Sequence, residues 1–155
     1  MNTTARLPHR ELAPEALRAM VAVTTAVGKS TLGKPLLDLV YLRVSQVNGC
    51  AYCLDLHARD LLADGETFQR INSLLTWREV AFFTARERAA LNRAESLTLL
   101  TQTQAPDADY EPLAAHFSER EVAELTFAIA QMNAWNRLGV GMKLPVQALP
   151  LKAQA

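Results

Sequence analysis

The segment RVSQVNGCAYCLDLH, residues 43–57, decides the fold because it predicts the end of one helix and the start of the next. Asn48-Gly49 is a typical helix stop, and Gly33-Lys34-Pro35 is a typical helix start. After Asn48-Gly49, a second helix is predicted to begin at Cys50 and to run to about Ala63, before Asp64-Gly65. In the helix before this turn, residues 33–47, apolar residues recur every three or four positions. This spacing predicts one buried face made of Leu36, Leu39, Val40, Val44 and Val47.

The rest of the chain shows the same helical spacing. Two capping boxes mark helix starts, Thr84 with Glu87 and Ser118 with Glu121, because each hydroxyl accepts an early backbone N–H and each glutamate reaches back to the cap. The predicted helices cover residues 14–27, 33–47, 50–63, 66–75, 84–102 and 118–138.

No stretch alternates apolar and polar residues for long enough to predict a strand. The sequence also has no internal repeat and no low-complexity linker that would divide it. We therefore expect an all-α fold of about six to seven helices in a single domain, residues 1–155. Residues 105–109 are predicted to form a loop, and residues 142–155, which contain Pro145 and Pro150, an irregular tail.

Composition excludes several classes of function. The chain has 155 residues, and its 16 Lys and Arg balance its 16 Asp and Glu, so it lacks the excess of positive charge that nucleic-acid binding requires. No apolar run is long enough to cross a membrane, and the first twenty residues contain no signal-peptide core. We expect a cytoplasmic protein with no nucleic-acid or membrane partner, in which the two cysteines are kept reduced unless they do redox chemistry.

The two cysteines and one histidine form the candidate site. Cys50 and Cys53 are three residues apart and His57 is four beyond Cys53, so one helix presents all three on one face. A position in the first helical turn favours a thiolate, because the unpaired N–H groups and the helix dipole stabilise negative charge. His57 adds a base beside the second thiol. Thiolate is the reactive form of cysteine, so both features indicate reactivity.

Three interpretations of this trio stay open at this point. The cysteines could simply pack in the core beside a hydrogen-bonded histidine. They could bind a metal, although about 10 Å separates residues 50 and 57 along a helix axis and no second pair of ligands follows. They could form a dithiol redox centre, which requires only that the two sulfurs meet. We expect no metal and no cofactor.

The spacing resembles the motif of the AhpD-like alkylhydroperoxidase family, within the carboxymuconolactone decarboxylase superfamily. In that motif an acidic residue precedes the first cysteine by twelve positions and a histidine follows the second by four; here these are Asp38, Cys50, Cys53 and His57. The resemblance spans roughly residues 12–142. It continues at residues 75–79, 86–88, 94–98 and 133–137.

The resemblance implies a peroxidase. Cys53 would attack a peroxide and become a sulfenic acid, and Cys50 would resolve it to a disulfide that an external dithiol reduces. His57, supported by Asp38, would carry protons. The expected partners are a peroxide substrate, a reductant such as a lipoylated or thioredoxin-like protein, a peroxiredoxin, and further copies of the chain in a trimer or hexamer.

Two residues depart from the family pattern. Asp38 stands where the peroxidase motif has Glu, and Tyr52 stands where the best-known peroxidases have a second histidine. The helix-terminus argument also favours Cys50 as the more acidic thiol, whereas the family assigns the attack to Cys53. The alternatives are the lactone or decarboxylation chemistry of the wider superfamily, which does not need the cysteines, and a helical redox sensor without catalysis.

Several other side chains have roles that the sequence predicts. Ser45, seven residues after Asp38, is expected on a similar side of its helix, where it could hydrogen-bond near the site. Asn133 and Asn136 are expected to satisfy buried backbone groups or a subunit contact. Arg86-Glu87-Arg88 is expected to be a solvated charged face, and Trp135 is expected in the core or at a subunit interface.

Overall fold

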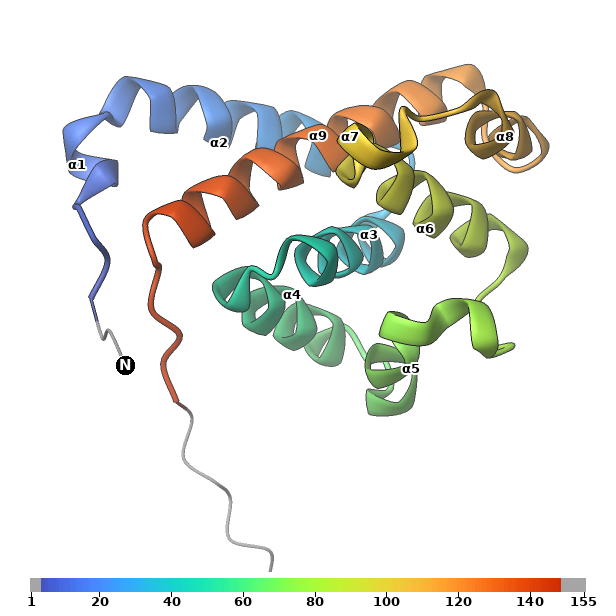
Figure 1. Ribbon diagram of the computed structural model, residues 1–155, viewed down its shortest axis with the longest axis horizontal. Coiled ribbons are helices and arrows are strands. Elements are labelled where there is room, and N and C mark those ends of the chain that lie inside the picture. Colours follow the sequence, from blue (N-terminus) through green and yellow to red (C-terminus); the bar gives the residue numbers. More distant parts are fainter. Residues whose placement is uncertain (1–3, 149–155) are drawn as a thin grey trace, which may run out of the picture.

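Helix α3 lies at the centre of the fold, where it contacts α4, α6 and α9 (Figure 1). The structure is a computed structural model that describes residues 4–148. In chain order the described residues form α1 (His9–Leu12), α2 (Pro14–Gly28), α3 (Lys34–Asn48), α4 (Ala51–Ala63), α5 (Phe68–Ser73), η1 (Leu74–Glu79), α6 (Ala85–Thr98), α7 (Leu100–Thr103), α8 (Asp107–Tyr110), η2 (Glu111–Ala115) and α9 (Glu119–Gly141). Within residues 4–148 there is no strand, so the predicted all-α fold is confirmed.

Helix α3 is central because its sequence is apolar on more than one face. Leu39 and Leu42 pack into one apolar cluster with α4, η1 and α6, and Val40 and Val44 pack into another with α2, α6 and α9. A helix that is hydrophobic around most of its circumference is stable only when neighbours cover it on every side. The sequence predicted one buried face for this helix, and the structure buries two.

The turn after α3 has the predicted helix-stop geometry. Gly49 adopts a left-handed conformation with φ of 65°, which a residue without a Cβ adopts at little cost. The backbone N–H of Gly49 donates to the carbonyl of Gln46, and that of Cys50 to the carbonyl of Ser45. This turn reverses the chain within two residues, so α4 begins beside the C-terminal end of α3.

Several helices differ in detail from the prediction. Nine α-helices and two 3-10 helices occur in residues 4–148, more than the expected six to seven, because single helical turns form at residues 9–12, 100–103 and 107–110. The last of these lies in the predicted loop 105–109, so that prediction is wrong from Asp107 onward. The predicted helix over 84–102 is interrupted at Leu99. Near this break the hydroxyl of Thr103 donates to the backbone carbonyls of Ser96 and Leu99.

The two ends of the described chain lie next to each other. The backbone N–H of Arg6 donates to the carbonyl of Met142 at 2.8 Å, and its guanidinium donates to the carbonyl of Gly141 at 3.0 Å. Beyond Met142 the described residues are irregular, as expected, whereas Pro150 lies outside the described residues. None of the helices in residues 4–148 has the length and apolar character to cross a membrane.

The capping box of α6 provides a first prediction. Thr84 Oγ1 accepts the backbone N–H of Glu87 at 3.2 Å, and the Glu87 carboxylate accepts the backbone N–H of Thr84 at 2.7 Å. Thr84→Ala removes the first bond and is expected to lower the free energy of unfolding by about 1 kcal/mol in urea denaturation. Thr101→Ala is the control, since Thr101 is exposed and its hydroxyl bonds no described residue. Equal stability of the two variants would contradict the role of the cap.

Candidate active site

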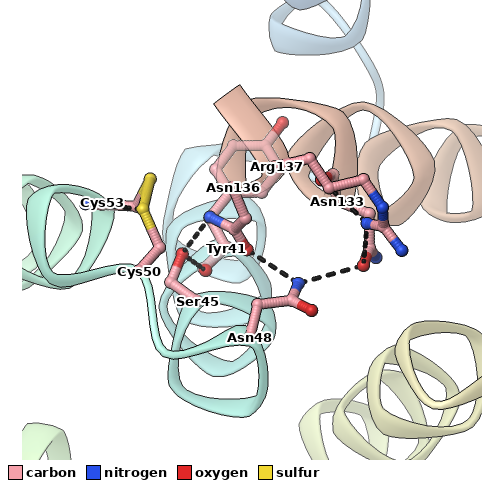
Figure 2. The surroundings of a disulfide bond; sticks show 8 residues. All are labelled: Tyr41, Ser45, Asn48, Cys50, Cys53, Asn133, Asn136 and Arg137. Carbon is pink, nitrogen blue, oxygen red and sulfur yellow. Dashed lines mark hydrogen bonds between the residues drawn. A yellow bond between two sulfur atoms is a disulfide. The ribbon is translucent and has the colours of Figure 1, made fainter. Parts of the chain in front are cut away.

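The two cysteines meet at the start of α4, where they form a disulfide (Figure 2). Their Cα atoms are 5.4 Å apart, and both side chains are buried, with 1% of Cys50 and 4% of Cys53 exposed. Cys50 is the N-cap residue, and its Sγ accepts the backbone N–H of Cys53 at 3.4 Å. The first turn of α4 therefore places one sulfur against an unpaired N–H, which favours a thiolate once the pair is reduced.

Helix α9 closes the Cys50 side of the pair. Gly139 has no side chain, and a Cβ added there would lie 2.7 Å from Cys50 Sγ and 3.5 Å from Cys53 Sγ. Real Cβ atoms do not approach other atoms so closely, so α9 packs against the sulfurs only because residue 139 is glycine. No sequence pattern singles out Gly139, since it lies within a helix that continues through it.

The Cys53 side of the pair faces a cavity of about 230 Å³. Cys53 is among the residues that line this cavity and Cys50 is not. Most of the lining side chains are apolar or aromatic, the kind of surface that binds the organic part of a small molecule. The lining comprises His9, Arg10, Thr24, Tyr41, Tyr52, Cys53, Leu56, His57, Gln131, Met132, Trp135, Leu138 and Leu144.

His57 lies between the cavity and a pair of carboxylates. It is buried, with 9% of its surface exposed, and its Nδ1 is 3.7 Å from Asp60 Oδ2. Asp38, which is buried in α3, also approaches it, since one ligand-type atom from each of these three residues lies within 4.8 Å of the others. The expected proximity of Asp38 to the histidine of the CxxC helix is therefore present, although the two residues are on different helices.

Burial is the largest influence on His57 and lowers its pKa below the ordinary value of 6.5. The carboxylates of Asp38 and Asp60 act in the opposite direction, and Lys34 again lowers the pKa. Burial therefore favours the neutral imidazole, the form that has a lone pair for a proton. Its Nδ1 is buried and has no hydrogen-bond partner among the described residues.

Asp38 is held by Lys34. The Lys34 ammonium donates to Asp38 Oδ2 at 2.6 Å and also pairs with Asp64. One imidazole and two carboxylates are a donor set that a divalent cation could use, and it differs from the cysteine-based set weighed from the sequence. Here the ion pair with Lys34 holds the Asp38 carboxylate in place next to His57.

A network of buried amides supports the opposite side of the disulfide (Figure 2). Asn136, with 1% of its surface exposed, donates to Ser45 Oγ at 3.0 Å and accepts from Asn48 Nδ2 at 2.9 Å. Asn48 also donates to Asn133 Oδ1 at 3.0 Å, and Ser45 donates to the carbonyl of Tyr41 at 2.8 Å. These bonds join α9 to the end of α3 just before the cysteine turn. Asn133, Asn136 and Ser45 therefore position the site.

A second row of hydrogen bonds runs along the cavity wall. Trp135 Nε1 donates to Thr24 Oγ1 at 2.9 Å, Thr24 Oγ1 donates to Gln131 Oε1 at 2.7 Å, and Gln131 Nε2 donates to the Tyr41 hydroxyl at 2.8 Å. Sequence reasoning missed Thr24, Gln131 and Tyr41, and it assigned Trp135 to packing. The available signal was the position of Tyr41, three residues after Asp38 on the same helix face.

The arginines at residues 86–88 are not a solvated face. Arg86 bonds the carbonyl of His116 and the carboxylate of Glu121, and its guanidinium lies 4.0 Å from the ring centre of Phe117. Arg88 donates to the carbonyl of Trp77 at 2.9 Å. The expectation fails because planar guanidinium groups satisfy carbonyls and stack on rings while they remain partly buried.

The structure combines a helical bundle, a CxxC pair at a helix start and a histidine next to a carboxylate. These features are those of a helical protein with a dithiol site. Residues 14–96 match the model of the carboxymuconolactone decarboxylase family, and the chain belongs to this family. The AhpD-like resemblance recognised in the sequence is thereby confirmed at the level of the family.

Relatives and solved structures agree with this assignment. The chain is 36% identical to the uncharacterized protein YdfG of Bacillus subtilis over 88% of this chain and 93% of that protein. It is 39% identical, with a TM-score of 0.88, to a crystal structure from Agrobacterium tumefaciens described as a candidate antioxidant defence protein AhpD, over 92% of this chain and 99% of that one. A peroxidase-related protein from Silicibacter is 28% identical, with a TM-score of 0.72, over 84% and 69% of the two chains.

Gly139 provides a prediction about packing on the sulfurs. Gly139→Ala gains roughly 0.5–1 kcal/mol of helix propensity but forces a methyl group onto Cys50 Sγ, and such overpacking costs about 1–3 kcal/mol. We expect a net loss of about 1 kcal/mol in thermal or urea unfolding of the oxidised protein. Gly141→Ala, two residues further along α9, is the matched control, because a Cβ there has nothing within 4 Å. A Gly139→Ala variant as stable as Gly141→Ala would show that α9 does not rest on the sulfurs.

The lowered pKa of His57 predicts a pH dependence of stability. The unfolded chain takes up a proton on this histidine near pH 6.5, whereas the folded protein resists it. The free energy of unfolding of the wild type should therefore decrease as the pH falls through about 6.5, and His57→Asn should lose this part of the decrease. His116→Asn, at a position outside the cavity, controls for replacement of a histidine. Parallel pH profiles for the wild type and His57→Asn would rule out this assignment.

Proposed function

We propose that the protein is a thiol-dependent peroxidase that reduces peroxides through the Cys50–Cys53 pair. The observation that carries the proposal is that the cavity is lined by Cys53 and not by Cys50. Cys53 lines an apolar cavity beside His57, whereas α9 covers Cys50. A substrate in the cavity would contact Cys53, and Cys50 would react only afterwards, with the oxidised Cys53. This arrangement supports Cys53 as the attacking residue, in agreement with the family assignment.

The proposed cycle begins with the reduced dithiol. His57 accepts the Cys53 proton, and the Cys53 thiolate attacks the terminal peroxide oxygen; the S–O bond forms, the O–O bond breaks and an alcohol leaves. The Cys50 thiol then attacks the Cys53 sulfenic acid; the S–S bond forms, the S–O bond breaks, and the hydroxyl leaves as water with the Cys50 proton. Asp38 stabilises the positive charge that appears on His57. The disulfide of the structure corresponds to the end of this cycle.

Each turn of the cycle requires two electrons from outside the protein. We propose an external dithiol as their source, either a lipoylated protein or a thioredoxin-like protein, with a peroxiredoxin as a further partner. The homo-oligomer, a trimer or hexamer, is proposed on the same family resemblance. The name of the Silicibacter relative, a peroxidase-related protein, supports the reaction class.

The test compares the wild type with Cys53→Ser and Cys50→Ser. With cumene hydroperoxide and excess dithiothreitol, we expect the wild type to consume peroxide catalytically and Cys53→Ser to lose at least about a hundredfold of that rate. Cys50→Ser should still be oxidised once at Cys53, which dimedone traps as a single adduct by mass spectrometry.

The two variants control for each other, because each replaces one sulfur by oxygen at the same helix start. A dimedone adduct on Cys50 in Cys53→Ser, with none on Cys53 in Cys50→Ser, would reverse the assignment of roles. Peroxide consumption by the wild type no faster than by Cys53→Ser would contradict the function itself.

The name of the matched family favours a second candidate, the decarboxylation or opening of a lactone. That chemistry does not require thiols, so an activity on a carboxymuconolactone that survives Cys53→Ser would favour it. A redox sensor is the third interpretation. A sensor would be oxidised once by peroxide and would stop, whereas a catalyst turns over for as long as the reductant is supplied.

A further inference from the structure

Tyr41 lies on the wall of the cavity that Cys53 and His57 also line. Its ring centre is 5.2 Å from that of His57, and 8% of its surface is exposed. Tyr41 comes from α3 and His57 from α4, so the contact between these helices fixes the phenol relative to the CxxC turn. The hydroxyl is therefore a fixed polar group in surroundings that are otherwise mainly apolar.

The Tyr41 hydroxyl lies at the end of a row of hydrogen bonds and accepts from Gln131. The indole N–H of Trp135 can only donate, so Thr24 Oγ1 accepts from it. The Thr24 hydroxyl has two acceptors within reach, Gln131 Oε1 at 2.7 Å and the Met20 carbonyl at 3.1 Å. The amide N–H of Gln131 then donates to the Tyr41 oxygen. The Tyr41 hydroxyl is the last member of the row, and its own proton has no acceptor among the described residues. That proton is available to a molecule in the cavity.

We propose that Tyr41 is a further catalytic residue, whose hydroxyl gives a proton to the oxygen that leaves when the Cys53 thiolate splits the peroxide bond. The inference rests on the proposed peroxidase function and adds a general acid to it. An alkyl hydroperoxide releases an alkoxide, which is a strong base and a poor leaving group without a proton. Neither sulfur can supply that proton, because Cys53 attacks as a thiolate and Cys50 lies behind α9. The proton taken from Cys53 is on His57, whose ring lies beside Tyr41, so the phenol passes a proton to the leaving oxygen and is reprotonated from His57.

The step balances in atoms and charge. Two electrons pass from Cys53 to the peroxide, the terminal oxygen stays on sulfur as the sulfenic acid, and the alkoxide leaves as an alcohol with the Tyr41 proton. The proton that His57 took from the Cys53 thiol returns the tyrosinate to its neutral form. No oxidant, reductant or metal is needed besides the peroxide and the thiol.

The environment of Tyr41 keeps the phenol protonated. Burial is the main cause that raises its pKa to about 12, with a further increase from Asp38, while the Gln131 bond acts in the opposite direction. A phenol in this state is neutral at working pH and still more acidic than an alcohol. Tyr52 also lines the cavity, but its hydroxyl belongs to no row of hydrogen bonds within residues 4–148.

The experiment compares two peroxides that differ in their need for a proton. Cumene hydroperoxide and perbenzoic acid each carry one phenyl ring, but the first releases an alkoxide and the second a benzoate that leaves readily as an anion. Reduced wild type, Tyr41→Phe and Tyr52→Phe are mixed with each peroxide, and the loss of the Cys53 thiol is followed in a single turnover by quenched flow. Melting temperatures establish that each variant is folded.

We expect Tyr41→Phe to slow oxidation by cumene hydroperoxide roughly a hundredfold and oxidation by perbenzoic acid less than about threefold. Equal slowing of both reactions would make Tyr41 a packing residue only, and unchanged rates would remove any role. Selective slowing in Tyr52→Phe instead would assign the donor to Tyr52 and overturn the inference. A wild type that reacts with neither peroxide would refute the proposed function, an outcome visible before any variant is measured.

Discussion

The burial of α3 on more than one face is the constraint on which the rest of the structure depends. Because α4, α6 and α9 all contact this helix, its two ends and its polar residues have fixed positions relative to three neighbours. Asp38 and Tyr41 point toward α4 from one part of the helix, and the left-handed turn at Gly49 places the cysteines at its end. The site therefore consists of groups whose geometry follows from the core rather than from a loop.

Much of the fold could be predicted from the sequence, and the reason is local. The glycines and prolines at helix ends and the two capping boxes act within one turn of the backbone, so they are visible in a single stretch of sequence. The CxxC spacing and His57 are local in the same way. The short turns around residues 100 and 107 were missed, because single helical turns leave almost no periodic pattern.

The part of the candidate site that the sequence did not predict consists of contacts between residues distant in sequence. Gly139 reaches Cys50 across 89 positions, and Gln131 reaches Tyr41 across 90. Nothing in the sequence around Gly139 or Gln131 indicates such a contact, because each is an ordinary member of a long helix. The resemblance to a known family supplied the roles of the cysteines, whereas only the packing of α9 shows why the two sulfurs differ.

The joined chain ends have a consequence for the cavity. His9 and Arg10 from one end and Leu144 from the other contribute to its lining, and Arg6 links the two ends through Met142 and Gly141. The candidate reactive groups thus lie on α3 and α4, while part of the enclosure is made by segments outside the central helices. Substitutions in those segments would change the size and polarity of the chamber without disturbing the reacting groups. The fold thus separates the outer walls of the cavity from the helices that hold the candidate reactive groups in place.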